Sequence, residues 1–258
     1  MRRFVDQWQN RPMTRILVPY HLDEHRPGLD VPYEPGVTVT RELAGDDVWA
    51  RLAGLYGEVA DIVADDVRSG RVPLVMSGDC MVSQAVVAGV QRAHDGAPPS
   101  VVWFDAHGDV QTLETTTSGY LGGMPLRMIA GYRPELLADR LGQQPVPEDR
   151  IVLVDGRDLD PPERDYLAAS DIRQLFAAEL AGEHVPPGPV YLHVDLDVVD
   201  GAQLPGLLFP VPGGPSASEV GQAVRRVLDT GRVAAVGLGC TWHDGHGAAA
   251  RVRDALPF

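Results

Sequence analysis

The chain has 258 residues, of which 44% are hydrophobic and 22% charged, and its formal net charge is −14. This length and composition predict one α/β domain with a sizeable core, and the negative charge disfavours nucleic acid and anionic membranes as partners. Because no run of about 18 apolar residues and no signal-peptide pattern is present, we expect a cytoplasmic protein. The two cysteines fit a reducing compartment. All 22 basic residues are Arg, which excludes a lysine Schiff base and a P-loop lysine.

Strand-like and helix-like segments alternate along the chain. Residues 1–12 differ in character from the rest of the chain and are expected to form a flexible leader, with 13–258 as the single domain. The predicted strands are Ile16–Tyr20, Val37–Thr40, Val72–Met76, Val101–Phe104, Ile151–Val154, Val190–Val194 and Val233–Leu238. The predicted helices are Asp46–Ser69, Ser83–Ala93, Pro125–Ala130, Pro162–Ala169, Ile172–Leu180, Ser218–Thr230 and a short one from Gly247. This order predicts a three-layer α/β/α domain with a mostly parallel sheet.

Three potential metal ligands follow the strand Val101–Phe104 directly. Asp105, His107 and Asp109 are spaced two apart, which puts their side chains on one side of an extended backbone. In open parallel sheets, ligands bind at the carboxyl ends of the strands. Two carboxylates and an imidazole suit Mn²⁺, with Zn²⁺ or Fe²⁺ as alternatives. The other interpretation is a polar loop after a strand.

A second strand-like run carries carboxylates at the same spacing. Asp195 and Asp197 follow Tyr191–Val194, and buried carboxylates are costly unless a positive charge lies between them. A metal pair would supply that charge. His193 lies on the same face and is either a partner of the ligands or a core histidine, and we prefer the second interpretation. Cys240 is expected to be a core thiol, without evidence for a disulfide.

Three motifs in order resemble the arginase/agmatinase ureohydrolase family. Ser77–Met81 is similar to its G-G-D-H-S, Phe104–Asp109 to its D-A-H-x-D and Asp195–Asp200 to its D-x-D-x-x-D. The resemblance implies an arginase-like fold and a binuclear manganese site. It also implies hydrolysis of a guanidino or amidino C–N bond by a metal-bridging hydroxide, in a trimeric or hexameric enzyme.

The resemblance also implies which residues hold the metals. Asp105 and Asp195 would bridge the two ions. Cys80 and Asp109 would complete the shell of one ion, and His107 and Asp197 that of the other. Asp109 would in addition accept a hydrogen bond from the hydroxide and thus act as a catalytic residue. Cys80 stands where the family has histidine, and its softer thiolate shifts the preference towards Zn²⁺ or Fe²⁺.

The substrate pocket departs further from the family pattern. Tyr120 replaces an asparagine that helps to bind the substrate carboxylate, and Gly122 replaces a histidine thought to shuttle protons. Trp242 stands where a glutamate would pair with the guanidinium, and its ring could hold a planar cation instead. We therefore assign Tyr120, Gly122 and Trp242 to substrate binding. The aspartates of the metal motifs match the family pattern, whereas these pocket positions differ from it. This combination indicates a non-standard substrate, for example an N-hydroxyguanidine such as N-hydroxyarginine.

The segment after Trp242 offers replacements for the missing proton shuttle. His243 is the candidate catalytic residue, His246 a candidate substrate contact, and Asp244 lies between them; the alternative interpretation is a polar turn. Two other functions remain open at this point. One is a catalytically inactive arginase-fold protein that binds a metabolite or a partner, and the other is a single-zinc amide hydrolase. The expected partners are a small guanidino substrate and further copies of the chain, with neither nucleic acid nor membrane.

Overall fold

The computed structural model describes residues 11–258, so residues 1–10 of the predicted leader lie outside the described part. Eight strands form one sheet in the order β4-β1-β5-β10-β9-β6-β7-β8, and every neighbouring pair is parallel. These strands are β1 (Met13–Val18), β4 (Val37–Thr38), β5 (Val72–Ser77), β6 (Ser100–Asp105), β7 (Ile151–Asp155), β8 (Arg173–Leu175), β9 (Val190–Asp195) and β10 (Val233–Gly239). A separate antiparallel hairpin pairs β2 (Tyr20–His21) with β3 (Glu24–His25).

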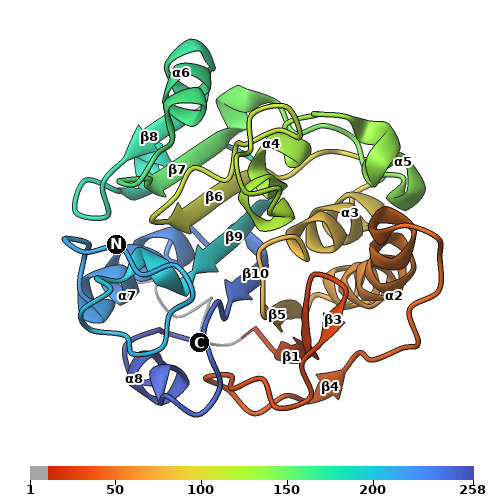
Figure 1. Cartoon of the computed structure of the whole chain (residues 1–258), viewed down its shortest axis with the longest axis horizontal. Helices are drawn as coiled ribbons and strands as arrows, with labels where there is room; N and C mark the ends of the chain where they lie inside the picture. The colour runs from red at the N-terminus through yellow and green to blue at the C-terminus, as the bar shows by residue number, and fades with distance from the viewer. Residues whose placement is uncertain (1–10) are drawn as a thin grey trace.

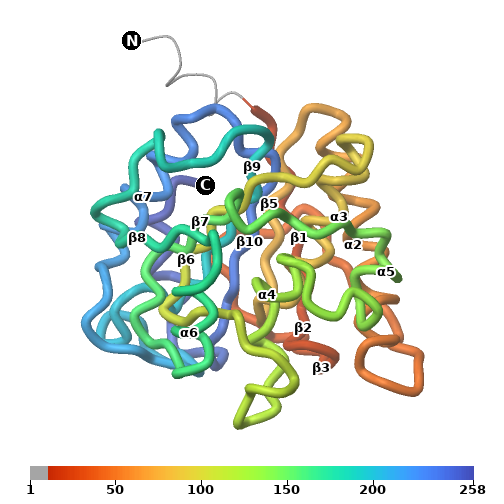
Figure 2. The backbone as a smooth tube through the Cα atoms, turned by 90° about the horizontal axis from the view of Figure 1, so that it is seen from above, coloured from red at the N-terminus to blue at the C-terminus, as the bar shows by residue number. Residues whose placement is uncertain are grey.

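Helices cover both faces of the sheet, which confirms the predicted three-layer architecture. The helices are α2 (Val48–Arg68), α3 (Ser83–Ala93), α4 (Pro125–Ile129), α5 (Ala138–Leu141), α6 (Pro161–Ala169), α7 (Ala217–Leu228) and α8 (Ala248–Arg253). Short 3₁₀ turns are η1 (Leu121–Gly123), η2 (Pro134–Leu136), η3 (Glu148–Arg150), η4 (Gly182–His184) and η5 (Leu196–Val198). Figures 1 and 2 show α2 and α3 on one side of the sheet and α7 on the other.

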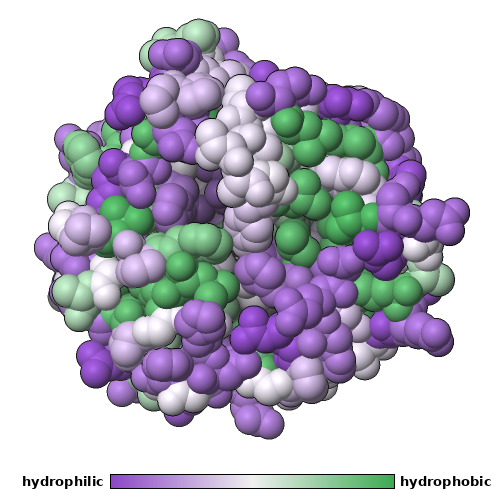
Figure 3. All heavy atoms as spheres, in the orientation of Figure 1, coloured by the Kyte–Doolittle hydropathy of each residue, from purple (hydrophilic) through white to green (hydrophobic). Residues whose placement is uncertain are grey.

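The alternation of side chains along the strands divides the core between the two faces. In β6, Trp103 packs in the apolar cluster that contains α2 and α3, whereas Phe104 packs in the cluster that contains α7. Both side chains are fully buried, as expected for a strand covered on both sides. The next residue after Phe104 is the first predicted metal ligand, so the core itself brings the ligands to the carboxyl edge of the sheet. Figure 3 shows a mixture of polar and apolar side chains on the face of the domain that is turned to the viewer.

The two helices on one face pack closely because of a glycine. A Cβ atom added to Gly89 of α3 would lie 2.7 Å from the carbonyl oxygen of Ala60 in α2. Helix α2 begins where the Asp47 side chain accepts a hydrogen bond from the Ala50 amide at 2.8 Å, which caps a free helical N–H group. Helix α3 starts at Ser83, three residues after Cys80 in the loop that follows β5.

One predicted helix is wrong. Ile172–Leu180 contains the edge strand β8 instead, in which Arg173 pairs with Val152 and Leu175 with Val154 of β7. The short apolar pattern of this segment is compatible with both a helix and a strand. Pairing with the edge of β7 selects the strand. Within residues 11–258, no helix is both long enough and apolar enough to cross a membrane.

Candidate metal centre

The predicted ligands converge where the central strands end. Asp105 ends β6 and Asp195 ends β9, and these two strands are neighbours. On the other side of β9, Gly239 of β10 pairs with Asp195. A Cβ atom added to Gly239 would lie 3.0 Å from Cys80 Sγ and 3.1 Å from Asp195 Oδ2, so the glycine leaves room for both side chains.

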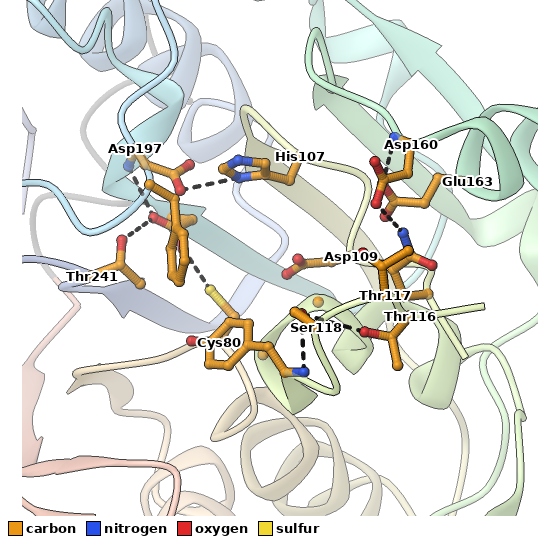
Figure 4. Close-up of a pocket in the computed structure, with 16 residues that line it drawn as sticks. Cys80, His107, Asp109, Thr116, Thr117, Ser118, Asp160, Glu163, Asp197 and Thr241 are labelled. Carbon is orange, nitrogen blue, oxygen red and sulfur yellow. Dashed lines mark hydrogen bonds and ion pairs between the residues drawn. The ribbon is translucent and has the colours of Figure 1, made fainter. Parts of the chain in front are cut away.

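Two groups of potential ligands share one aspartate. Cys80, Asp105 and Asp109 form one group, and Asp105, His107 and Asp197 form the other; within each, the ligand atoms lie within 4.8 Å of one another. The shared residue is the one expected to bridge two ions. Figure 4 shows several of these side chains facing a common space. The structure therefore brings together residues that lie up to 117 positions apart, from Cys80 to Asp197.

Asp195 lies between the two groups and is held by three donors. Its Oδ2 accepts a hydrogen bond from the Cys80 thiol at 2.8 Å, and its Oδ1 accepts bonds from Thr241 Oγ1 at 2.8 Å and the Asp197 amide at 2.9 Å. The Asp195 carboxylate is thus fixed beside Cys80; its role as a second bridge stays a prediction.

Asp109 is a candidate ligand whose carboxylate has few hydrogen-bond partners in the protein. Its backbone adopts φ 54°, a left-handed conformation that is uncommon outside glycine. Its Oδ2 atom is buried and has no hydrogen-bond partner among the residues that the structure describes. A buried, unpaired carboxylate oxygen is costly, and a cation is the kind of group that removes this cost.

The electrostatics of the centre also favour bound cations. Burial, reinforced by the neighbouring carboxylates, raises the pKa of Asp109 and Asp195 well above their usual range. Burial raises the pKa of Asp197 to about 6. Burial opposes the charge of His107, but hydrogen bonds to Asp105 and Asp197 outweigh it and raise its pKa to about 12. One imidazolium is left to balance four carboxyl groups, so the donor set fits divalent metal ions.

The imidazole behind Cys80 is a core histidine, as preferred from the sequence. His193 is fully buried, stacks on Trp103 with ring centroids 3.8 Å apart, and has Nε2 at 3.2 Å from Cys80 Sγ. Burial lowers its pKa to about 3, which keeps the ring neutral. Cys240 is also buried, and both cysteines are free, so the described structure contains no bridge between them.

A cavity of about 220 Å³ opens over the metal ligands. Tyr120 and Gly122 line it, as predicted. The lining residues that were not predicted from the sequence are Gln111, Thr116, Thr117, Ser118, Gly123, Asp160, Glu163, Phe209 and Thr241. Two of them, Asp160 and Glu163, form the capping box that starts α6, with the Asp160 amide donating to Glu163 Oε2 at 3.1 Å. This motif predicts the start of a helix but not a place in a cavity.

The structure does not bring Trp242, His243 or His246 to this cavity, which corrects their predicted placement. Trp242 is only 1% exposed, and its indole N–H donates to the Asp30 carbonyl at 3.1 Å. His243 and His246 are exposed on the surface beyond it. Because successive side chains in an extended segment point to opposite sides, the neighbouring Thr241 faces the ligands instead.

The fold and the acidic centre define a parallel α/β domain with a ligand cluster at its strand ends, and comparison with known proteins identifies its family. The arginase family model matches residues 30–238, so the chain belongs to the arginase family. It is 32% identical to an arginase of Bacillus subtilis over 187 residues, covering 67% of this chain and 62% of that protein. Identity to an arginase of Brevibacillus brevis is 35% over 176 residues, covering 63% and 58%. The matched segments thus span less than two thirds of these relatives.

Solved structures agree with this assignment over a larger part of the chain. The arginase from Bacillus caldovelox superposes with a TM-score of 0.78 and 25% identity, covering 94% of this chain and 96% of that one. A formimidoylglutamase from Bacillus subtilis shares the fold, with a TM-score of 0.70 and 17% identity over 96% of this chain and 88% of its own.

Proposed function

We propose that the protein is a binuclear-metal hydrolase that cleaves a C–N bond of a small guanidino or amidino compound. The observation that carries this proposal is the pair of candidate ligand groups that share Asp105 and whose other members line one cavity: Cys80, His107, Asp109 and Asp197. Family membership supports the reaction class. Two adjacent divalent cations, when bound, would supply Lewis-acid activation of water near neutral pH.

The chain's own residues would hold and orient the reactants. Cys80 and Asp109 would ligate one ion and His107 and Asp197 the other, with Asp105 and Asp195 between them; Mn²⁺ is the proposed metal, and the sulfur makes Zn²⁺ or Fe²⁺ the alternatives. The Oδ2 atom of Asp109, which has no hydrogen-bond partner among the described residues, would also accept a proton or hydrogen bond from the attacking water.

The proposed substrate is less basic than arginine, as N-hydroxyguanidines are. Position 242 presents no carboxylate to the cavity, because Trp242 is buried elsewhere. The carboxylate of Glu163 lines the cavity, but it already accepts the amides of Val110 and Asp160 at 3.2 Å and 3.1 Å. A substrate that carries a full guanidinium charge would therefore find no carboxylate from position 242 and a Glu163 carboxylate that two amides already engage. By similarity to the family, we also propose a cytoplasmic homo-oligomer.

The first test measures metal content per chain by mass spectrometry after incubation with Mn²⁺. We expect two ions in the wild type and in Cys240→Ala, the control that removes the other buried thiol. Cys80→Ala should lose one ion, and Cys80→His should retain two. If the wild type binds one ion and Cys80→His binds two, the proposal of a binuclear site in the wild type is contradicted.

The second test follows turnover of arginine, agmatine and N-hydroxyarginine by release of the urea-type product. We expect the highest kcat/KM for N-hydroxyarginine and no turnover by Asp197→Ala. If the wild type binds two metals but hydrolyses no guanidino compound, the protein is better explained as an inactive binding protein. A single bound Zn²⁺ with amide cleavage would instead support an amide hydrolase.

A further inference from the structure

The phenol of Tyr120 occupies the space where a side chain at position 122 would begin. A Cβ atom added to Gly122 would overlap with Tyr120 Cζ and with its hydroxyl oxygen. Tyr120 lines the cavity and is otherwise flanked by Phe209, with ring centroids 5.2 Å apart. The wall of the cavity at Gly122 is therefore formed by the polar end of the Tyr120 side chain.

The Tyr120 hydroxyl is paired with an imidazole from a distant part of the chain. His21, at the end of β2, has Nε2 at 3.1 Å from this hydroxyl, and the two rings are stacked 5.6 Å apart with an interplanar angle of 16°. Its Nδ1 lies 2.8 Å from the carbonyl oxygen of Gly78. A carbonyl can only accept a hydrogen bond, so Nδ1 carries a proton and Nε2 of the neutral ring accepts the Tyr120 O–H.

This arrangement can carry a proton to the cavity. When the His21 ring gains a second proton, on Nε2, this nitrogen donates to the Tyr120 oxygen, and the proton of the hydroxyl is then free to be donated elsewhere. His21 is half-buried, so its side chain is partly accessible to solvent.

We propose that Tyr120 and His21 form a proton relay that protonates the leaving nitrogen of the substrate; this rests on the proposed function. The oxygen of water bonds to the guanidinium carbon, and the proton that the water loses goes to a carboxylate at the floor. The C–N bond breaks with its electron pair on nitrogen, which takes the proton of the Tyr120 hydroxyl, while the added oxygen forms the C=O bond of the urea-type product and releases its remaining proton to solvent. Tyr120 regains a proton from His21, and His21 from solvent, while the carboxylate at the floor releases its proton to solvent.

Other imidazoles are less well placed for this role. His107 lines the cavity, but its Nδ1 is held at 3.3 Å from Asp105 and 3.2 Å from Asp197 among the proposed ligands. His243 and His246 lie outside the cavity. The imidazole that serves the cavity is therefore supplied by the β2–β3 hairpin, from a segment that the sequence alone presents as a polar loop.

The test compares Tyr120→Phe and His21→Ala with His25→Ala, an exposed histidine in the same hairpin. Metal content and Tm are measured for each variant, together with kcat and KM for the substrate that the wild type hydrolyses. We expect Tyr120→Phe and His21→Ala to lose kcat by about 10²-fold or more, the range of general acid catalysis, with KM and metal content unchanged. Added imidazole should restore part of the kcat of His21→Ala but not of Tyr120→Phe, and His25→Ala should match the wild type.

Each other outcome overturns the relay in a distinguishable way. An active wild type with equally active Tyr120→Phe would overturn the relay and leave the proposed function standing. Two results would assign the pair a packing role only. One is loss of metal in Tyr120→Phe, which keeps the aromatic ring, and the other is a kcat of His21→Ala that added imidazole does not restore. A wild type that is inactive towards every guanidino compound would overturn both proposals.

Discussion

Replacing Asp109 by Asn should stabilise the metal-free protein and weaken its response to metal. The Asp109 carboxylate is buried, its Oδ2 has no hydrogen-bond partner within the described residues, and Asp105 and Asp195 raise its pKa further after burial. Asn keeps the shape of the side chain, removes the charge and presents N–H donors to those carboxylates. Relief of one unsatisfied buried group is worth about 1–3 kcal/mol.

The magnitude can be translated into a melting temperature. For a domain of this size, about 1 kcal/mol shifts Tm by about 2–4 °C, so a gain of about 2 kcal/mol should raise the Tm of metal-free Asp109→Asn by about 4–8 °C. In the wild type, metal at about 100 times its Kd adds about 2.7 kcal/mol per site. Because Asp109 belongs to one of the two ligand groups, the variant should retain about half of the metal-induced gain.

The assay is thermal unfolding at pH 8 with chelator and with Mn²⁺, beside Asp139→Asn, which changes an exposed aspartate on α5. The control should follow the wild type in both conditions. If metal-free Asp109→Asn is less stable than the wild type, Asp109 is not a strained, unpaired carboxylate. A full metal-induced gain in the variant would show that Asp109 is not a ligand.

Three further expectations concern the acidic centre and the residues that support it. The pKa of Asp197 is about 6 in the folded protein against 3.8 for an ordinary aspartate, so its neutral carboxyl group stabilises the metal-free protein below pH about 4. This stabilisation, about 3 kcal/mol, should be lost as the pH rises from about 4 through 6. Denaturant unfolding from pH 4 to 7 measures the loss. Gly122→Ala should displace the Tyr120 ring and cost about 1–3 kcal/mol in thermal unfolding, whereas Gly57→Ala, with open space in α2, should be stabilising. Arg157 donates to Asp155 and to loop carbonyls that include Asp197, so Arg157→Met should cost about 3–5 kcal/mol and weaken metal binding measured by calorimetry.

The local sequence was sufficient to predict the fold class and the position of the candidate ligands that directly follow strands. The apolar run before Asp105 and the one before Asp195 predict buried strands, and the carboxyl ends of parallel strands lie at one edge, so their ligands had to meet. The segment Ile172–Leu180 was different, because its short apolar pattern is compatible with both helix and strand. Only the unpaired edge of β7 decided that it forms β8.

The wall of the cavity depended on contacts between distant segments. Nothing near His21 in the sequence indicates that its ring stacks on Tyr120, because the two residues lie 99 positions apart. Trp242 and Thr241 are adjacent in sequence, yet the twist and packing of the chain turn one into the core and the other to Asp195. Composition and periodicity determine which segments are buried and where strands end, whereas the direction of each side chain around a cavity is set by long-range packing, which the tertiary structure alone decides.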